Sequence, residues 1–477
     1  MATTITHGVS TSKKETSVST PNVAASGIHF VVGTAPVQMV GGKTNEVLML
    51  NNYEEAAAAL GYSDEWKKYG LCEEIYTAFV LYKIAPVFMV NVLDPAKHKK
   101  AAGDTTEKEV SDGQIKLPLE AIADSVAITG KTAGTDFEVF YDDKNCIIEF
   151  LTEAPKKTAV TYDVVDPEAV TEDDIIGGYN VSTHKTTGLE LIDSVFPKYT
   201  EAPDIILCPN WSHNSNVAAV MSAKAENINA LFEAFAVLDI DTTKDGTTYY
   251  TEAPEWKKAH NFMKVNELVC FPKVKLGDKM FNLSTQLAGS IAATDNNTSY
   301  GDGTPCESAS NKSLQADSMC LDDGTEVLLD LQAANYLNDN GIITALNFYN
   351  GFVSWGNYTA AFPASTDPVD YIYCISRMFK WVAKTVTLSY WATIDRKLTR
   401  RLIDTILQGV NDWLNALTAE EKILGGRVEF LEHENSLTAL MAGKAKFHIY
   451  LTPPSPLQKL EFVLEYDVSY LSALLAA

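Results

Sequence analysis

Strand-like runs alternate with helical stretches through the first and middle parts of the chain, and this alternation constrains its fold more than any other feature. The runs at residues 85–93 and 204–208 are mostly apolar, as expected of buried strands. Further strands are predicted at residues 27–37, 46–50, 236–240 and 267–271, and helices at residues 54–60, 71–82, 189–196, 216–235 and near 283–293. Strands that alternate with helices indicate layers of both, so an α/β fold is expected.

The composition changes between residues 96 and 175, which are rich in Lys, Asp, Glu, Thr and Gly. Short alternating runs such as Phe137–Tyr141 and residues 146–150 are separated by turn residues, a pattern typical of a small all-β domain. Because the α/β alternation resumes afterwards, we predict that residues 96–175 are an inserted all-β domain on the surface.

Both ends of the chain are expected to be extended arms. Residues 1–26 are rich in Thr, Ser and Val and contain little that could pack. At the other end, a proline-rich break at residues 453–456 precedes a predicted strand at residues 459–467. The residues that form the apolar face of this strand are Leu460, Phe462, Leu464 and Tyr466. A strand with one apolar and one acidic face suits a half-buried sheet.

The last third of the chain contains long amphipathic helices. Helices are predicted at residues 327–338, 371–390 and 393–417, and strands at residues 342–349, 428–432 and 446–451. In the helix predicted at 393–417, apolar residues from Ile394 to Leu417 form one stripe, and the basic residues fall away from it.

The expected class is therefore α/β and α+β multidomain. The predicted units are an N-terminal arm (1–26), an α/β middle domain (27–95 and 176–325), the all-β insert (96–175), a C-terminal domain with a mixed sheet flanked by helices (326–458), and a last strand or arm (459–477). A chain of 477 residues is too long for one ordinary core, which agrees with several domains.

The charge argues against one class of partner. The net charge of -24 would repel phosphates, so a general nucleic-acid binder is not expected. The chain has only five arginines, all in its last quarter: Arg377, Arg396, Arg400, Arg401 and Arg427. Since Arg suits bidentate pairing with carboxylates, this region is the better candidate for contact with an acidic partner.

The cysteines and the apolar segments bear on where the protein works. Seven scattered cysteines without a CxxC pair suit reduced thiols in a cytoplasm. The N-terminal residues have no apolar core and do not resemble a signal peptide. The longest apolar stretch, residues 79–93, is too short to span a bilayer. We therefore expect synthesis in the cytosol and no direct membrane insertion.

The common catalytic motifs are missing. Gly42-Lys43-Thr44 resembles the end of a P-loop, but its first glycine would fall at Val37 and a strand follows. There is no G-x-S-x-G elbow and no H-E-x-x-H helix. We expect no catalytic residue, no cofactor and no metal site. An α/β enzyme with an unrecognised active site remains an alternative.

Several motifs occur in a fixed order near the C-terminus. Asn340-Gly-Ile-Ile-Thr344 is followed by Gly351-Phe-Val-Ser-Trp-Gly-Asn-Tyr-Thr359, then by a helix that begins Arg401-Leu-Ile-Asp404 and by Leu440-Met-Ala-Gly-Lys444. In this order they resemble the contractile tail sheath proteins of myovirus-type phage tails and R-type tailocins. The family patterns are N-G-[IV]-x-T and G-x-x-x-W-G-x-x-T.

Weaker matches extend the resemblance to most of the chain except residues 96–175. They are His7-Gly-Val9, Pro203-Asp-Ile-Ile-Leu-Cys-Pro209 and Ser308-Ala-Ser-Asn-Lys312. Two departures stand out, Ala309 where Pro is usual and Tyr358 where many members have Arg. Any salt bridge that this Arg makes is absent here.

The resemblance implies a structural role. Six subunits would form a ring around a tail tube, rings would stack helically, and contraction would drive the tube into a target cell. The implied partners are further copies of the chain, a tail tube protein, and baseplate and tail terminator proteins. Assembly would take place in the bacterial host cytoplasm, and the sheath would then be part of a virion tail or a tailocin particle.

The resemblance also suggests which residues touch neighbours. The candidates for strands exchanged between subunits are Val9, Val18, Leu460, Phe462, Leu464 and Tyr466. The candidates for contact with an acidic tube surface are Arg377, Lys380, Lys384, Arg396, Lys397, Arg400 and Arg401. Other self-assembling proteins, such as a tube, baseplate or surface-array subunit, remain alternatives.

Overall fold

The fold is built around a six-stranded sheet in which all neighbouring strands are parallel except at one edge. In spatial order the strands are β16 (Glu267–Cys270), β15 (Phe235–Asp239), β14 (Ile205–Leu207), β1 (His29–Gly33), β3 (Val87–Asn91) and β2 (Leu48–Leu50), the last antiparallel. The computed structural model describes residues 21, 23–102, 107–142, 144–297, 302–349 and 351–474.

Apolar sequence explains why the central strands are buried. Every residue of β1, β3 and β15 is buried, as expected of parallel strands covered on both faces. The helices and helical turns associated with this sheet are α1 (Tyr53–Leu60), α2 (Gly70–Ile75), the π-helical η2 (Tyr76–Tyr82), α3 (Glu172–Ile176), α4 (Val195–Tyr199), α5 (Ser215–Glu226), α6 (Ala253–Ala259) and α7 (Leu283–Asn297). The mixed α/β class predicted from the sequence is confirmed.

One predicted helix is too long. The helix predicted at residues 216–235 ends at Glu226, and Phe235 already begins β15. Asn229 and Ala230 have positive φ angles of 54° and 57°, so the chain turns there instead of continuing the helix. No Gly or Pro signals this turn in the sequence.

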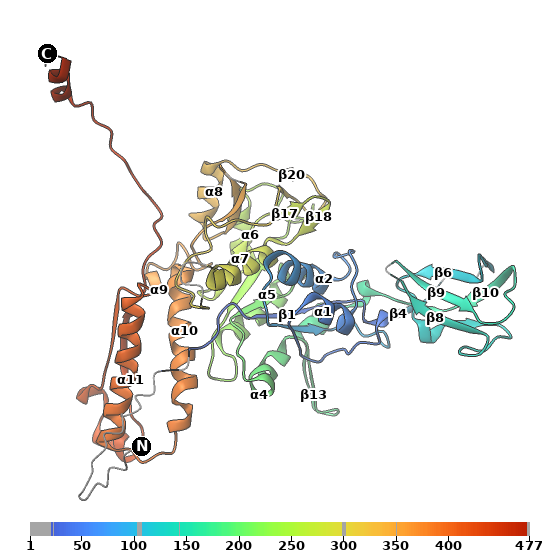
Figure 1. The fold of residues 1–477 in the computed structure, drawn as a ribbon, viewed down its shortest axis with the longest axis horizontal. Helices are drawn as coiled ribbons and strands as arrows, with labels where there is room; N and C mark the ends of the chain where they lie inside the picture. The colour runs from blue at the N-terminus through green and yellow to red at the C-terminus, as the bar shows by residue number, and fades with distance from the viewer. Residues whose placement is uncertain are drawn as a thin grey trace, which may run out of the picture.

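The inserted segment has a core of its own. Its strands are β4 (Lys99–Ala101), β5 (Glu107–Glu109), β6 (Gln114–Pro118), β7 (Ala127–Ile128), β8 (Phe137–Tyr141), β9 (Asn145–Phe150), β10 (Lys157–Thr161) and β11 (Asp163–Val165). They project from the α/β body (Figure 1) around a separate cluster that includes Phe137 and Ile148. The antiparallel pair of β4 and β11 is the stem.

The predicted end of the insert at residue 175 lies too far along the chain. Val165, Val170 and Ile175 are buried in the main core, and α3 packs against α5. A hairpin of β12 (Gly178–Asn180) and β13 (Lys185–Thr187) follows and projects from the body (Figure 1).

The main core continues past the boundary predicted at residue 326. Ile343 bonds to both Val269 and Phe271 and so extends the sheet next to β16. The core includes Ile342 and Ile375 as well. The elements of this region are β17 (Lys273–Leu276), β18 (Lys279–Phe281), β19 (Ser318–Cys320), β20 (Glu326–Val327), α8 (Leu331–Asn338), β21 (Thr344–Asn347), β22 (Phe352–Trp355) and α9 (Pro368–Tyr371).

Two long antiparallel helices, α10 (Tyr373–Tyr390) and α11 (Arg400–Ala419), form a second unit with its own apolar cluster (Figure 1). Trp381 and Trp413 lie at its centre with ring centroids 5.6 Å apart. The helix predicted from residue 393 begins later, because Thr399 caps it by accepting a hydrogen bond from Leu402 N. Within the described residues, no helix is long and apolar enough to cross a membrane.

Candidate assembly surfaces

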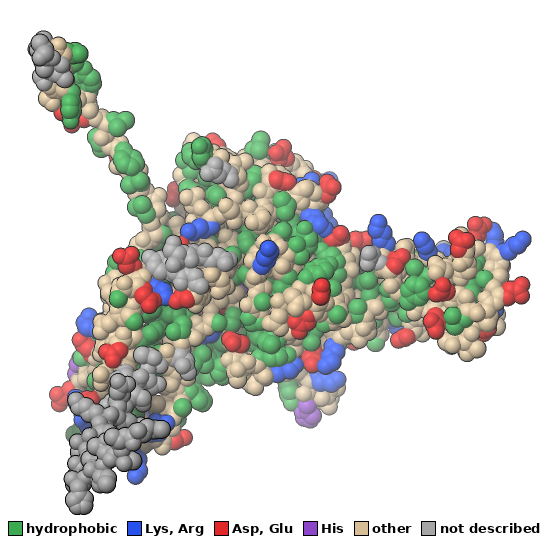
Figure 2. Space-filling model, in the orientation of Figure 1, with side chains coloured by type: hydrophobic (Ala, Val, Ile, Leu, Met, Phe, Trp, Pro, Cys, Tyr) green, Lys and Arg blue, Asp and Glu red, His purple; other side chains and the backbone are tan. Residues whose placement is uncertain are grey.

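The C-terminal arm is an exposed apolar segment. Residues 457–470 are exposed and extend away from the body (Figure 1), with hydrophobic side chains along them (Figure 2). The exposed fractions are 65% for Leu460, 78% for Phe462, 95% for Leu464 and 75% for Tyr466. The predicted strand at residues 459–467 is not formed in the single chain, which provides no neighbouring strand for it.

The root of this arm is held against the body. The Tyr358 hydroxyl donates a hydrogen bond to Gln458 Oε1 at 2.6 Å, and the centroid of the Tyr358 ring lies 4.2 Å from that of the Phe362 ring. The position that departs from the family pattern thus makes a contact of its own.

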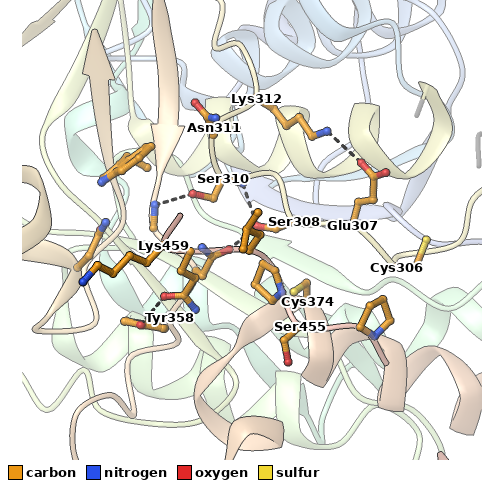
Figure 3. A pocket seen from close by; sticks show the side chains of 18 of the residues that line it. Cys306, Glu307, Ser308, Ser310, Asn311, Lys312, Tyr358, Cys374, Ser455 and Lys459 are labelled. Carbon is orange, nitrogen blue, oxygen red and sulfur yellow. Dashed lines mark hydrogen bonds and ion pairs between the residues drawn. The ribbon is translucent and has the colours of Figure 1, made fainter. Parts of the chain in front are cut away.

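A cavity of about 1100 Å³ lies beside this root (Figure 3). It is lined by the loop at residues 306–312, the end of β22 and the arm residues 454–459. In this loop Lys312 forms an ion pair with Glu307 at 2.9 Å, and Ser310 accepts a hydrogen bond from Gly356 N at 3.1 Å. The cavity is open and mixed in polarity, and the arm passes along it.

A two-stranded sheet packs on α11. It consists of β23 (Gly425–Glu429) and β24 (His448–Thr452), and a loop containing the short helix α12 (Leu437–Met441) connects them. The Asn411 side chain from α11 accepts from Val428 N at 3.0 Å and donates to Val428 O at 3.2 Å. It therefore occupies the outward backbone groups of β23 at that position. Within the described part of the chain β24 pairs only with β23.

A basic tip joins α10 to α11. The tip residues Arg396, Lys397, Arg400 and Arg401 are exposed, as are Trp391 (61%) and Ile394 (64%) next to them. Arg400 forms an ion pair with Asp404 at 2.9 Å, but both side chains are more than half exposed, so this pair contributes little. All four basic side chains are therefore accessible to an outside partner.

Two of the residues predicted to contact the tube are buried in the subunit. Arg377 and Lys384 are only 4% and 7% exposed, and both are bonded within the chain. Lys380 forms an ion pair with Glu233 at 2.6 Å. The amphipathic pattern of α10 does not reveal this burial, because the partners come from distant parts of the sequence.

The N-terminal candidates Val9 and Val18, and the match at His7-Gly-Val9, lie outside the described residues. Their part in strand exchange stays a prediction.

The polar side chains at the carboxyl end of the sheet are mostly hydrogen-bonded within the chain. Asp239 is buried and accepts from the hydroxyls of Ser212 at 2.8 Å and Ser284 at 2.5 Å. Burial raises the pKa of Asp239. A polar cavity of about 200 Å³ lies beside it. Among the residues that the structure places, no group of three or more His, Cys, Asp or Glu is positioned to hold a metal ion.

No protein-family model matches this chain. It is 28% identical over 500 residues to the tail sheath protein of Burkholderia phage BcepMu, and the match covers 99% of each chain. A shorter match, 30% identical over 155 residues, covers 32% of this chain and 38% of the tail sheath protein of Escherichia phage P2.

The chain is related to phage tail sheath proteins. The resemblance that the motifs predicted is therefore confirmed. Solved structures agree on the fold. The sheath complex of an extracellular contractile injection system (PVC) in its contracted state matches with a TM-score of 0.59 at 12% identity, over 98% of this chain and 100% of that one. The contracted helical sheath of the anti-feeding prophage (AFP) matches with a TM-score of 0.56 at 11% identity, with the same coverage.

The sheath-like motifs meet in space. Asn311 N, in the Ser308–Lys312 motif, donates to Ser354 O at 2.6 Å in the Gly351–Thr359 motif. Gly341 has a φ of +66°, and a Cβ there would lie 2.6 Å from Phe362 O. Glycine at this motif position is thus required by both backbone conformation and space.

Sequence reasoning missed three residues of these surfaces. Asn411, Gln458 and the hydrogen-bonding role of Tyr358 gave no recognisable signal, since each depends on a contact between distant segments.

Proposed function

We propose that this chain is the structural subunit of a contractile tail sheath. The observation that carries the proposal is the exposed apolar arm at residues 457–470, in a chain related over nearly its whole length to a tail sheath protein. A soluble subunit gains nothing by exposing Phe462 and Leu464 to water, whereas a strand donated to a neighbour would bury them.

The arm would add to the sheet of another copy at the edge of β24. The edge of β23 is the poorer acceptor, because Asn411 already occupies Val428 N and O. Backbone hydrogen bonds would provide the hold, and the alternating apolar residues would fix the register. The N-terminal arm, with Val9 and Val18, would pair in the same way.

In this proposal six subunits form a ring around a tail tube, and rings stack helically between a baseplate and a tail terminator. A likeness in fold to a chain of the anti-feeding prophage baseplate structure, with a TM-score of 0.56 at 12% identity, supports the proposed association with a baseplate. The sheath would assemble in the bacterial host cytoplasm and then be part of a virion tail or a tailocin particle. The work would be mechanical, with no catalytic step.

The tube would contact the tip between α10 and α11. Arg396, Lys397, Arg400 and Arg401 put several positive charges on one exposed turn of a chain whose net charge is -24. Single exposed ion pairs contribute only about 0.2–1 kcal/mol, so such contacts can hold together and still release during contraction.

The test is to express the chain alone and to examine it by sedimentation and negative-stain electron microscopy. We expect tubular polymers that sediment far faster than the 52.2 kDa subunit. A discrete small oligomer at all concentrations would contradict the proposal and favour an α/β enzyme.

A further inference from the structure

The chain just after the predicted N-terminal arm lies against α10. Trp381 Nε1 donates to Ala24 O at 2.8 Å, and Ala24 N donates to Thr385 Oγ1 at 3.2 Å. Lys384 Nζ donates to Ala25 O at 2.8 Å. Backbone groups on both sides of Ala24 are therefore held by side chains from one helix.

The α/β core holds the following residues from the other side. The Asp204 carboxylate accepts from Gly27 N at 3.0 Å and from Ile28 N at 2.7 Å. Ser26 Oγ donates to Asp295 Oδ2 at 2.8 Å. Gly27 has a φ of +71°, and a Cβ there would lie 2.9 Å from Ala292, so the chain passes close to α7 at a sharp bend.

Arg377 connects the two sides. Its guanidinium donates to Asp295 at 2.9 and 2.5 Å and to Asp204 at 3.1 Å, the same two carboxylates that hold residues 26–28. Although burial acts to raise it, the charges of Arg377 and Lys384 hold the pKa of Asp204 below its ordinary value. Replacing a buried ion network by apolar residues often leaves a fold equally stable or more stable. We therefore attribute this network to positioning of the root and not to stability.

The site is too full for a small ligand. The space among Ala25, Asp204, Arg377, Trp381 and Lys384 is only about 20 Å³. Ala24 belongs to the same apolar cluster as Trp381 and Trp413. The unit that carries β23 and β24 on α11 therefore also carries the root of the arm.

We propose that Trp381, Lys384 and Thr385 are positioning residues that fix the root of the N-terminal arm to α10, so that a pull on the arm passes directly to the unit that bears β23 and β24. This rests on the proposed sheath function. Several backbone hydrogen bonds would have to break together before the root could detach from α10. Without these bonds, the chain before Gly27 could rotate about that residue. The α/β core would be linked to α10 through Arg377, but it would not carry the force applied to the arm.

The test uses full-length Thr385→Val, which removes the hydroxyl acceptor but keeps the shape, and Trp381→Phe, which removes the indole donor but keeps a ring. Thr385→Ser should behave like wild type, because it keeps the hydroxyl acceptor. Thr387→Val is the matched control, because it makes the same change at a half-buried position two residues further along the same helix. Hydrogen exchange of residues 23–28 is measured on the dispersed subunit, and the urea concentration that disassembles the polymer is measured separately.

We expect exchange at residues 23–28 to rise at least about tenfold in the first two variants and polymers to dissociate at lower urea, with Thr385→Ser and Thr387→Val close to wild type. Unchanged exchange would overturn the proposal, and so would faster exchange with polymers of wild-type resistance. If the wild-type chain formed no polymer, the sheath function would fail, while the exchange result would still decide whether α10 holds the root.

Discussion

At the scale of single residues, Lys257 joins α6 to the sheath-like motifs. It is 3% exposed, and its ammonium donates to Asn340 O at 2.7 Å, Ala360 O at 2.8 Å and Phe362 O at 3.3 Å. Burial lowers the pKa of Lys257 to about 8, although Glu267 opposes the shift. The side chain thus ties two loops of the C-terminal motifs to the α/β core.

Lys257→Met should destabilise the subunit by roughly 1–3 kcal/mol at pH 7, because buried carbonyls lose their donor. Between pH 8 and the ordinary lysine pKa of 10.5, the unfolded chain holds a proton that the folded chain does not. The stability of wild type relative to the variant should therefore rise with pH in this range. Urea unfolding followed by tryptophan fluorescence at pH 7.5 and 9.5 measures this difference. Lys258→Met, at an exposed neighbour, is the control. A difference in the free energy of unfolding between wild type and Lys257→Met that stays constant with pH would contradict the account.

At the scale of elements, the C-terminal arm and the basic tip are the parts expected to act between molecules. Residues 459–467 alternate as in a strand but form no strand in the single chain, and the tip presents its charges outward. Each surface gives a separate prediction.

Leu464→Pro should abolish polymers while the subunit stays folded. Proline removes a backbone donor and fixes φ in the donated strand, so each arm contact should lose about 1–3 kcal/mol. Ser455→Pro is the matched control, since it adds the same residue at an exposed position of the proline-rich root. Sedimentation and electron microscopy give the readout. Polymers of normal length from Leu464→Pro would count against strand exchange through this arm.

Reversing Arg396, Arg400 and Arg401 to Glu should weaken assembly on a tail tube. Self-polymerisation should survive, because the proposed arm contacts lie elsewhere. Co-sedimentation with purified tube over a salt series measures the effect, which should be largest at low salt. Equal binding of variant and wild type at every salt concentration would show that the tip does not contact the tube.

Much of the element pattern could be predicted from the sequence, and its failures have physical causes. The buried strands at β3 and β14 were predictable because apolar runs between turns have few alternatives. The end of α5 was not, because no Gly or Pro marks the left-handed turn at Asn229 and Ala230. The burial of Arg377 was also unpredictable, since its partners Asp204 and Asp295 lie 173 and 82 residues away. Surfaces that depend on such distant pairs can therefore be identified only once the fold is known.

At the scale of the whole molecule, the insert is a separable unit on a two-stranded stem. Its apolar cluster is distinct from the main core, and Ala101 faces Asp163 across the stem. These features favour an independently folded module on the outside of the sheath.

Replacing residues 102–162 by Asn-Gly should leave folding and polymer formation intact. A two-residue turn suits the antiparallel stem, and the main-core residues Val165 and Ile175 are kept. Circular dichroism and electron microscopy check the two properties. A folded subunit that no longer forms polymers would show that the insert takes part in assembly.

The central claim is that subunits are joined by exchanged strands, and the structure of the polymer tests it most directly. Electron cryo-microscopy of polymers of the unmodified chain should show residues 459–467 of one subunit as a strand beside β24 of another, with Leu460, Phe462, Leu464 and Tyr466 alternating in register. An arm that folds back on its own subunit, or that stays unpaired in an intact polymer, would contradict the account.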